Sequence, residues 1–216
     1  MSRDLILGIE SAIGGGSLAI YEAGKELASW TGEARVSRAE EILPNIDRML
    51  NELDRRPKDL GTIVLSQGPG SFTGIRIGIA TALGLCESLG SRCVGITTLE
   101  ALAHHAGNGS FTVGVPMGRD MICIQPYKGG KAVSTPCLIT GEQFNDVLLK
   151  EDTGQFVVHR FIYQEYADSA GALRMIEGGI NIASLLCRAL DSAFATEKIH
   201  PLFIDRSTFT KSSVSG

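Results

Sequence analysis

The chain reads Gly68-Pro69-Gly70-Ser71-Phe72-Thr73-Gly74-Ile75-Arg76-Ile77-Gly78 where an apolar segment gives way to a long helical pattern. Residues 62–66, just before it, are apolar and rich in β-branched side chains, which indicates a strand buried on both faces. After it, apolar residues at positions 72, 75, 79, 83 and 86 follow the spacing of one helix face. With Ser71 as N-cap and Gly90 as C-cap, the pattern predicts a helix over residues 72–89.

The opposite face of this predicted helix carries very small side chains. Gly74, Gly78 and Ala82 lie at i, i+4 and i+8 and therefore form one strip. Glycine inside a helix costs about 1 kcal/mol relative to alanine, so we expect close packing on the strip to offset this cost. Two interpretations remain open: a second helix of a partner packs on the strip, or the strip packs on the core of the chain itself.

A glycine-rich turn before a helix can also bind phosphate through the N–H groups of the helix N-terminus. This junction lacks the lysine and the following hydroxyl residue of a P-loop, and Thr73 stands where a dinucleotide-binding motif starting at Gly68 needs its third glycine. Its spacing also differs from that of a nucleophile elbow. The junction therefore predicts none of these three sites.

The run GPGSFTGIRIG, placed between a strand and a helix, resembles the signature of the TsaB (YeaZ) family of bacterial tRNA threonylcarbamoyladenosine synthesis. The resemblance extends from Leu5 to about Ala103. It implies an α/β, actin-like (ASKHA, ribonuclease H-like) fold of two stacked subdomains. We expect residues 1–103 to form the N-terminal subdomain with the GPGSFTGIRIG helix, and residues 104–216 to form a smaller, diverged C-terminal subdomain.

The resemblance also implies a function. A TsaB-like chain is a non-catalytic scaffold that pairs as a heterodimer with TsaD, which transfers the threonylcarbamoyl group to the adenosine next to the anticodon of tRNA. A TsaE-like ATPase would join them in a larger complex, and the chain would contact nucleic acid only indirectly, through that complex. Without TsaD, we expect the chain to form a homodimer.

Pairing with TsaD is expected through the first two long helices of the chain. Residues 37–53 predict the earlier helix from their apolar spacing, with a capping box of Ser37 and Glu40 and with Pro44 bending it or marking its regular start. Arg38 stands where the family usually has histidine. The predicted partner-binding residues on the two helices are Ile42, Ile46, Met49, Gly74, Arg76, Gly78, Ala82 and Leu85.

The start of the chain predicts a strand over residues 5–10, a second over 17–21 after a glycine turn, and a third after Ala23-Gly24. In actin-like folds an acidic residue ends the first strand and the following hairpin loop touches nucleotide phosphate. Here Glu10-Ser11-Ala12 replaces the Asp-Thr-Ser that the family usually has, which argues against a phosphate or metal role. We expect no catalytic residue, no cofactor and no bound metal.

An enzyme on the same fold is the competing hypothesis, either a small ATP-dependent phosphotransferase or an M22-type, glycoprotease-like metallopeptidase. Related TsaD-like proteins use an H-x-x-x-H motif, whereas His104 and His105 are adjacent on a predicted helix over residues 99–105. Adjacent helical side chains point about 100° apart and do not easily face one ion. The acidic residues of the family stretch D-A-R-x-x-E-V-Y are also missing near Pro116, where Arg119 and Asp120 fit a solvated turn.

The second half predicts strands over residues 111–115, 121–127, 132–139, 155–161 and 201–205. It also predicts a short helix capped by Thr140 and ending near Lys150, and an apolar-faced helix over residues 180–194. Strands followed by helices in both halves suit two α/β subdomains, although the sequence has no clear internal repeat.

Composition limits the location and the partners of the chain. Its 216 residues are 44% hydrophobic and carry a net charge of −4, with no cluster of Lys and Arg that would bind nucleic acid directly. The five cysteines form no C-x-x-C pair, which indicates reduced thiols. Neither a signal peptide nor an apolar run approaching the ~20 residues needed to span a bilayer is present, so we expect a cytoplasmic protein without a membrane anchor.

Overall fold

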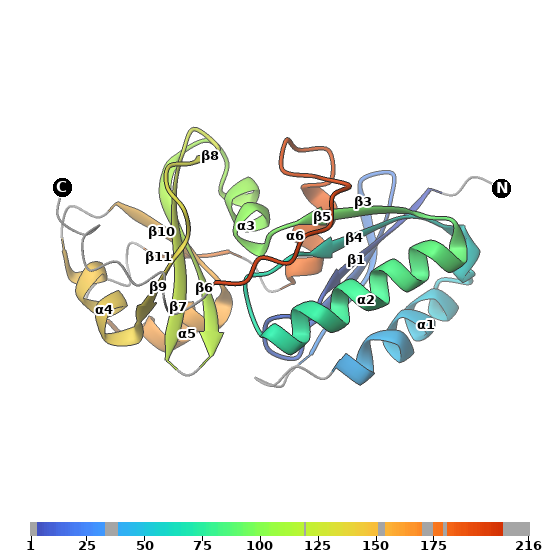
Figure 1. Cartoon of the computed structure of the whole chain (residues 1–216), viewed down its shortest axis with the longest axis horizontal. Helices are drawn as coiled ribbons and strands as arrows, with labels where there is room; N and C mark the ends of the chain where they lie inside the picture. The colour runs from blue at the N-terminus through green and yellow to red at the C-terminus, as the bar shows by residue number, and fades with distance from the viewer. Residues whose placement is uncertain are drawn as a thin grey trace. The chain divides into compact units, whose positions relative to one another are not determined.

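The chain folds into two units, which a computed structural model describes over residues 4–32, 39–118, 120–150, 154–169, 175–178 and 181–204 (Figure 1). Unit 1 comprises Met1–Ala101 together with Ile180–Leu202, and unit 2 comprises Leu102–Gly179 together with Phe203–Gly216. The predicted boundary near residue 103 differs from this division in one respect, because the segment 180–202 returns to unit 1 instead of staying with the second half.

Unit 1 is built on a five-stranded sheet of order β3-β2-β1-β4-β5. Strand β2 is antiparallel to both of its neighbours, whereas β1, β4 and β5 are parallel. The strands are β1 (Leu5–Glu10), β2 (Ser17–Glu22), β3 (Lys25–Thr31), β4 (Leu60–Ser66) and β5 (Arg92–Ile96). The sheet therefore places the ends of β1 and β4, the two strands that precede the glycine-rich turns, side by side.

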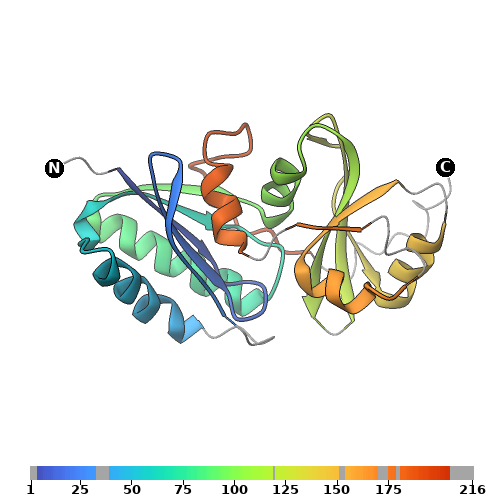
Figure 2. The same ribbon diagram turned by 180° about the vertical axis from the view of Figure 1, so that it is seen from behind.

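Helices cover both faces of this sheet (Figures 1 and 2). On one face lie α1 (Ile42–Glu52), preceded by the 3-10 turn η1 (Ala39–Glu41), and α2 (Phe72–Leu89). The short turn η2 (Pro57–Asp59) leads from α1 into β4. The other face is covered by α6 (Ile182–Arg188). Pro44 lies in the first turn of α1, where a missing N–H costs no helical hydrogen bond. Of the two predicted alternatives, a bend at Pro44 or a helix that starts near it, the structure shows the second.

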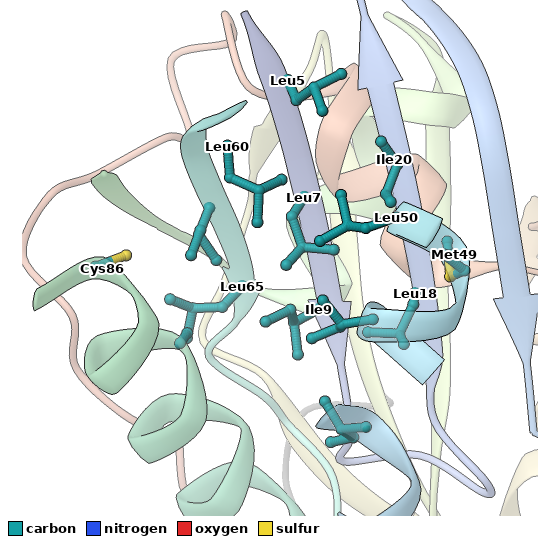
Figure 3. Close-up of a cluster of buried hydrophobic side chains, with 14 residues drawn as sticks. Leu5, Leu7, Ile9, Leu18, Ile20, Met49, Leu50, Leu60, Leu65 and Cys86 are labelled. Carbon is teal, nitrogen blue, oxygen red and sulfur yellow. The ribbon is translucent and has the colours of Figure 1, made fainter. Parts of the chain in front are cut away.

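The core of unit 1 follows from the alternation of side chains along β1 (Figure 3). Leu7 and Ile9 point into an apolar cluster with residues of α1 and α2. Gly8 points the other way, toward α6, where a Cβ atom would lie only 2.5 Å from the Ala183 carbonyl oxygen. A glycine at this position therefore lets α6 pack directly on the sheet.

The segment around α6 is fastened to unit 1 by side-chain and backbone hydrogen bonds. Asn181 caps α6 by accepting from the Ser184 N–H at 2.9 Å, and its Nδ2 donates to the carbonyl oxygens of Leu18 (3.1 Å) and Trp30 (2.9 Å). Further along, Thr196 exchanges two backbone hydrogen bonds with Gly95, at 2.8 and 3.1 Å. The returning segment thus covers one face of the sheet and the outer edge of β5.

Unit 2 is built on a second sheet of order β11-β10-β6-β7-β8, in which β9 also pairs with β7. Its strands are β6 (Ser110–Gly118), β7 (Met121–Lys128), β8 (Lys131–Ala132), β9 (Cys137–Thr140), β10 (Gln155–Val158) and β11 (Met175–Glu177). The helices of this half are α3 (Thr98–Ala106), which begins in unit 1 and ends in unit 2, α4 (Gly141–Leu149) and α5 (Arg160–Tyr166).

The two sheets share one topology. In each, the first strand pairs antiparallel with the second and parallel with the fourth, and the fifth strand lies parallel beyond the fourth. Strands β6, β7, β9, β10 and β11 correspond in this way to β1 through β5, and α4 and α5 occupy the places of α1 and α2 in the chain order. This repeated ribonuclease H-like arrangement confirms the predicted α/β, actin-like fold class.

Several predicted elements of the second half are wrong in extent. The single strand expected over residues 132–139 is two strands, with Pro136 between β8 and β9 lacking the N–H that a continuous ladder needs. The strand expected over 155–161 ends at Val158 because the side chain of His159 caps α5. Helix α6 is shorter than the predicted 180–194, and residues 201–204 form no strand. Ser37, Arg38 and Arg119 lie outside the described residues.

Candidate functional site

The helix α2 begins and ends at its predicted caps. The Ser71 side chain accepts a hydrogen bond from the Gly74 N–H at 3.3 Å, and Gly90 adopts the left-handed conformation, φ 65°, at the C-terminus. By length and composition alone, α2 is long and apolar enough to cross a membrane, a test that the core helix of a soluble protein also passes. In the structure α2 packs on the sheet of unit 1, with Ile75, Ala82 and Cys86 among its buried residues.

The strip of small residues on α2 faces the turn between β1 and β2. A Cβ atom at Gly74 would collide with the Ser11 carbonyl oxygen, and one at Gly78 with the Ser11 hydroxyl oxygen. The Ser11 hydroxyl donates to the Gly74 carbonyl oxygen at 2.8 Å, and the Ser71 N–H donates to the Ala12 carbonyl oxygen at 2.7 Å. The strip therefore packs on the chain's own turn, as one of the two interpretations predicted. It is not an open surface for a partner helix.

Most of the predicted partner-binding residues are buried in unit 1. Ile42, Ile46 and Met49 of α1 are between 1% and 4% exposed. Gly74, Gly78 and Ala82 of α2 are buried too, and Leu85 is half-buried against the same core. Arg76 alone of the eight is exposed, and its guanidinium carbon lies 3.7 Å from the centre of the Phe72 ring.

Large exposed apolar side chains lie elsewhere on the same two helices. Leu43 of α1 is 53% exposed, and Phe72 and Leu83 of α2 are 51% and 44% exposed. The sequence spacing placed Phe72 and Leu83 on one helix face with Ile75 and Cys86, but only Ile75 and Cys86 of these four are buried. The exposure of Leu43 could have been predicted from the sequence. Neighbouring residues on a helix point about 100° apart, so Leu43 points away from the core when Ile42 is buried.

The end of β1 carries a buried carboxylate. Glu10 is 2% exposed, and its Oε1 atom accepts the N–H groups of Ala12 at 2.5 Å and Ile13 at 2.8 Å. Burial raises the pKa of Glu10 from 4.5 to about 7, and these two hydrogen bonds oppose the rise. The turn thus directs two of its backbone donors at its own acidic residue. Within the described ranges no three His, Cys, Asp or Glu side chains gather where they could hold a metal ion.

The chain is similar to several named proteins in sequence and in fold. Residues 33–126 match the family model "TsaD: tRNA N6-adenosine threonylcarbamoyltransferase". The chain is 39% identical over 103 residues, 48% of its length, to the tRNA threonylcarbamoyladenosine biosynthesis protein TsaB of Buchnera aphidicola subsp. Schizaphis graminum, and the match covers 49% of that protein. It is 33% identical over 86 residues to the TsaB protein of Bacillus subtilis, 40% of this chain and 38% of that one.

Over about its first half, the chain is similar in sequence to proteins of the TsaB (YeaZ) family. It spans half or less of the length of the curated TsaB relatives that it matches. The structure of YeaZ from Pseudomonas aeruginosa matches 94% of this chain and all of its own length, with a TM-score of 0.65 and 20% identity. This likeness shows that the chain shares its fold with that YeaZ protein.

Proposed function

We propose that this chain is a non-catalytic subunit of a tRNA-modifying complex. It would pair with a TsaD-like protein and support transfer of a threonylcarbamoyl group to the adenosine next to the anticodon of tRNA (t6A synthesis). The names of its TsaB relatives and the TsaD family match over residues 33–126 support this role. The tRNA would bind to the assembled complex, which a TsaE-like ATPase joins, and the complex would act in the cytoplasm.

The observation that carries the proposal is the exposed apolar surface of α1 and α2, made of Leu43, Phe72 and Leu83. We call it the α1–α2 surface. Contiguous exposed apolar patches are typical of interaction sites, and we propose that these three side chains form one. Arg76 lies beside Phe72 and would contact the partner directly. The seven other predicted residues would hold α1 and α2 in place by packing on the sheet of unit 1.

The turn after β1 supports a non-catalytic role. Backbone N–H groups of such a turn bind nucleotide phosphate when they point into open space. Here the N–H groups of Ala12 and Ile13 are occupied by the Glu10 carboxylate, and the turn is hydrogen-bonded to the start of α2. A phosphate would have to displace a carboxylate that the same chain supplies, so we expect no ATP hydrolysis by the isolated protein.

Binding to the TsaD-like protein of the same organism tests the α1–α2 surface. Isothermal titration calorimetry with the variant Leu83→Asp should give at least tenfold weaker binding, because a charge replaces a buried apolar contact. Leu149→Asp is the matched control, since Leu149 is a 51% exposed leucine on α4 of unit 2. Equal loss of affinity in both variants, or in neither, would contradict the proposed surface.

The same surface should pair two copies of the chain when the TsaD-like protein is absent, because a twofold contact is the simplest closed way to cover it. Light scattering should then report a homodimer that becomes a heterodimer when the TsaD-like protein is added. A complex that retains two copies of this chain, joined through α1 and α2, would refute the shared surface.

Reconstituted modification tests the function itself. Supplied with a threonylcarbamoyl donor, the TsaD-like protein, the ATPase and tRNA should form t6A only when this chain is added, and this chain with the donor and tRNA alone should form none. Calorimetry with ATP and a divalent metal distinguishes the competing hypothesis, because tight binding that depends on Glu10 would favour a phosphotransferase.

A further inference from the structure

Two of the five cysteines meet at the end of α2. Cys86 lies in the last turns of α2 and is 8% exposed, and its Sγ lies 3.7 Å from the Arg92 carbonyl oxygen. The next residue, Cys93, is half-buried on β5. Cys93 pairs with Ile63 across the sheet, so its side chain points to the same face as Ile63, the face that α2 covers. Both cysteines therefore pack at one end of the same core cluster. Figure 3 shows Cys86 at this end of the cluster.

The chain between the two cysteines is short and fixed. Gly90 ends α2 in the left-handed conformation, and the Ser91 N–H donates to the Cys86 carbonyl oxygen at 3.1 Å. This turn brings β5 back along the helix end, where the Cys86 thiol donates to the Arg92 carbonyl oxygen and Cys93 packs against the cluster that contains Cys86. The neighbouring thiol of Cys86 lowers the pKa of Cys93, whereas the neighbouring Cys93, together with burial, raises the pKa of Cys86. Cys93 is thus both the more acidic and the more accessible thiol of the pair.

We propose that Cys86 and Cys93 form a reversible disulfide by exchange with a small-molecule disulfide such as oxidised glutathione. The Cys93 thiolate attacks one sulfur of that molecule, forms a mixed disulfide and releases one thiolate. Cys86 then gives its proton to solvent and attacks the sulfur of Cys93, which releases the second thiolate. One disulfide is consumed and one is formed, and the two released thiolates take up the two protons that the cysteines lost.

The other close pair of cysteines provides a contrast. Cys123 lies opposite Leu138, and Cys137 lies opposite Ile124, on the neighbouring strands β7 and β9. Because successive side chains of a strand alternate between faces, Cys123 and Cys137 point to opposite faces of the sheet and do not bridge. Lying on neighbouring strands is therefore not enough for two cysteines to form a disulfide. Cys86 and Cys93 differ from this pair because both lie on the same face of the sheet of unit 1.

The bridge would connect the last turn of α2 to β5. Those elements already pack through the core of unit 1, so the bond would tie the helix end that carries Cys86 to the strand that the returning segment borders. Reduction by an excess of thiol would restore the two free cysteines. Disulfide formation needs no partner protein, so its test does not depend on the proposed function.

The test uses the full chain incubated with oxidised glutathione and then mapped by mass spectrometry without reduction. We expect the intact protein to lose two hydrogen atoms and the peptides with Cys86 and Cys93 to be joined, while the other cysteines remain free. The variant Cys86→Ser should stop at the mixed disulfide and gain one glutathionyl group on Cys93. Cys93→Ser should gain none at Cys86, because that thiol is buried.

The double variant Cys123→Ser/Cys137→Ser is the matched control and should form the bridge as the parent does. The peptide map of the unmodified chain needs no variant, so it decides the outcome even if a serine variant fails to fold. The proposal is overturned if the unmodified chain keeps all five thiols free, if Cys93 stays in the mixed disulfide, or if the bridge joins other cysteines.

Discussion

Replacing Glu10 by glutamine should remove a large pH dependence from the stability of unit 1. The carboxyl group of Glu10 has a pKa of about 7 in the folded chain, against 4.5 for the unperturbed group. Between these two values the folded state holds a proton that the unfolded state has lost. The free energy of unfolding therefore falls as the pH rises through this window, by about 3 kcal/mol in total at 1.36 kcal/mol per pKa unit.

The glutamine variant should lack this fall, because its amide is uncharged at every pH. Both hydrogen bonds from the turn end on the single oxygen Oε1, and the amide oxygen of glutamine can take that position. Near pH 4.5 the two proteins should be about equally stable. Above pH 7 the variant should be the more stable by up to about 3 kcal/mol, which corresponds to a shift of roughly 1–3 M in the midpoint of urea unfolding.

Urea unfolding followed by tryptophan fluorescence measures this difference. Trp30 is the only tryptophan of the sequence and lies on β3, so its emission reports on unit 1. The control is Glu87→Gln, which changes an exposed carboxylate on α2 and should keep the pH profile of the parent chain. Parallel profiles for the parent and Glu10→Gln would refute the reasoning, because they would mean that the Glu10 proton does not distinguish the folded from the unfolded state.

Three further substitutions test the packing. Gly74→Leu should lower the free energy of unfolding of unit 1 by about 3 kcal/mol, because its side chain collides with the backbone of Ser11; an unchanged midpoint by Trp30 fluorescence would contradict that contact. Asn181→Ala removes the N-cap of α6 and its donors to β2 and β3 and should cost about 2 kcal/mol by the same measurement, whereas a loss below a few tenths would mean that α6 is held by apolar packing alone. Thr140→Ala should cost about 1 kcal/mol in unit 2 and speed amide hydrogen exchange in α4, whereas Thr140→Ser should leave both unchanged.

Local signals in the sequence predicted the elements that depend on few residues. The helix α2 spans the predicted residues because Ser71 and Gly90 stop it by their own chemistry. The capping box of Thr140 and Gln143 at α4 and the hydrogen bonds between Thr97 and Glu100 at α3 are of the same local kind. In each case the residues that decide the structure lie within one turn of one another.

The face of α2 that packs inward could not be predicted in this way. It is decided by Ser11, which lies 63 residues before Gly74 and reaches it only because β1 and β4 are neighbours in the sheet. A helical pattern taken alone places Phe72 and Leu83 on one face with buried residues and does not show that these two are exposed. The shared topology of the two units could not be predicted from the sequence either. The same strand order can be formed by different side chains, so the two units need not show a sequence repeat.

The return of residues 181–202 to unit 1 imposes an order on the synthesis of this protein. A ribosome completes the five strands of the first sheet once residue 96 has left it, but α6 and the segment that borders β5 are made only after the whole of unit 2. Until then the nascent chain carries a sheet with the Gly8 face uncovered and the edge of β5 unpaired, the kind of edge that recruits strands from other molecules. A pause in translation between residues 102 and 179 would therefore prolong the time during which the first unit can aggregate.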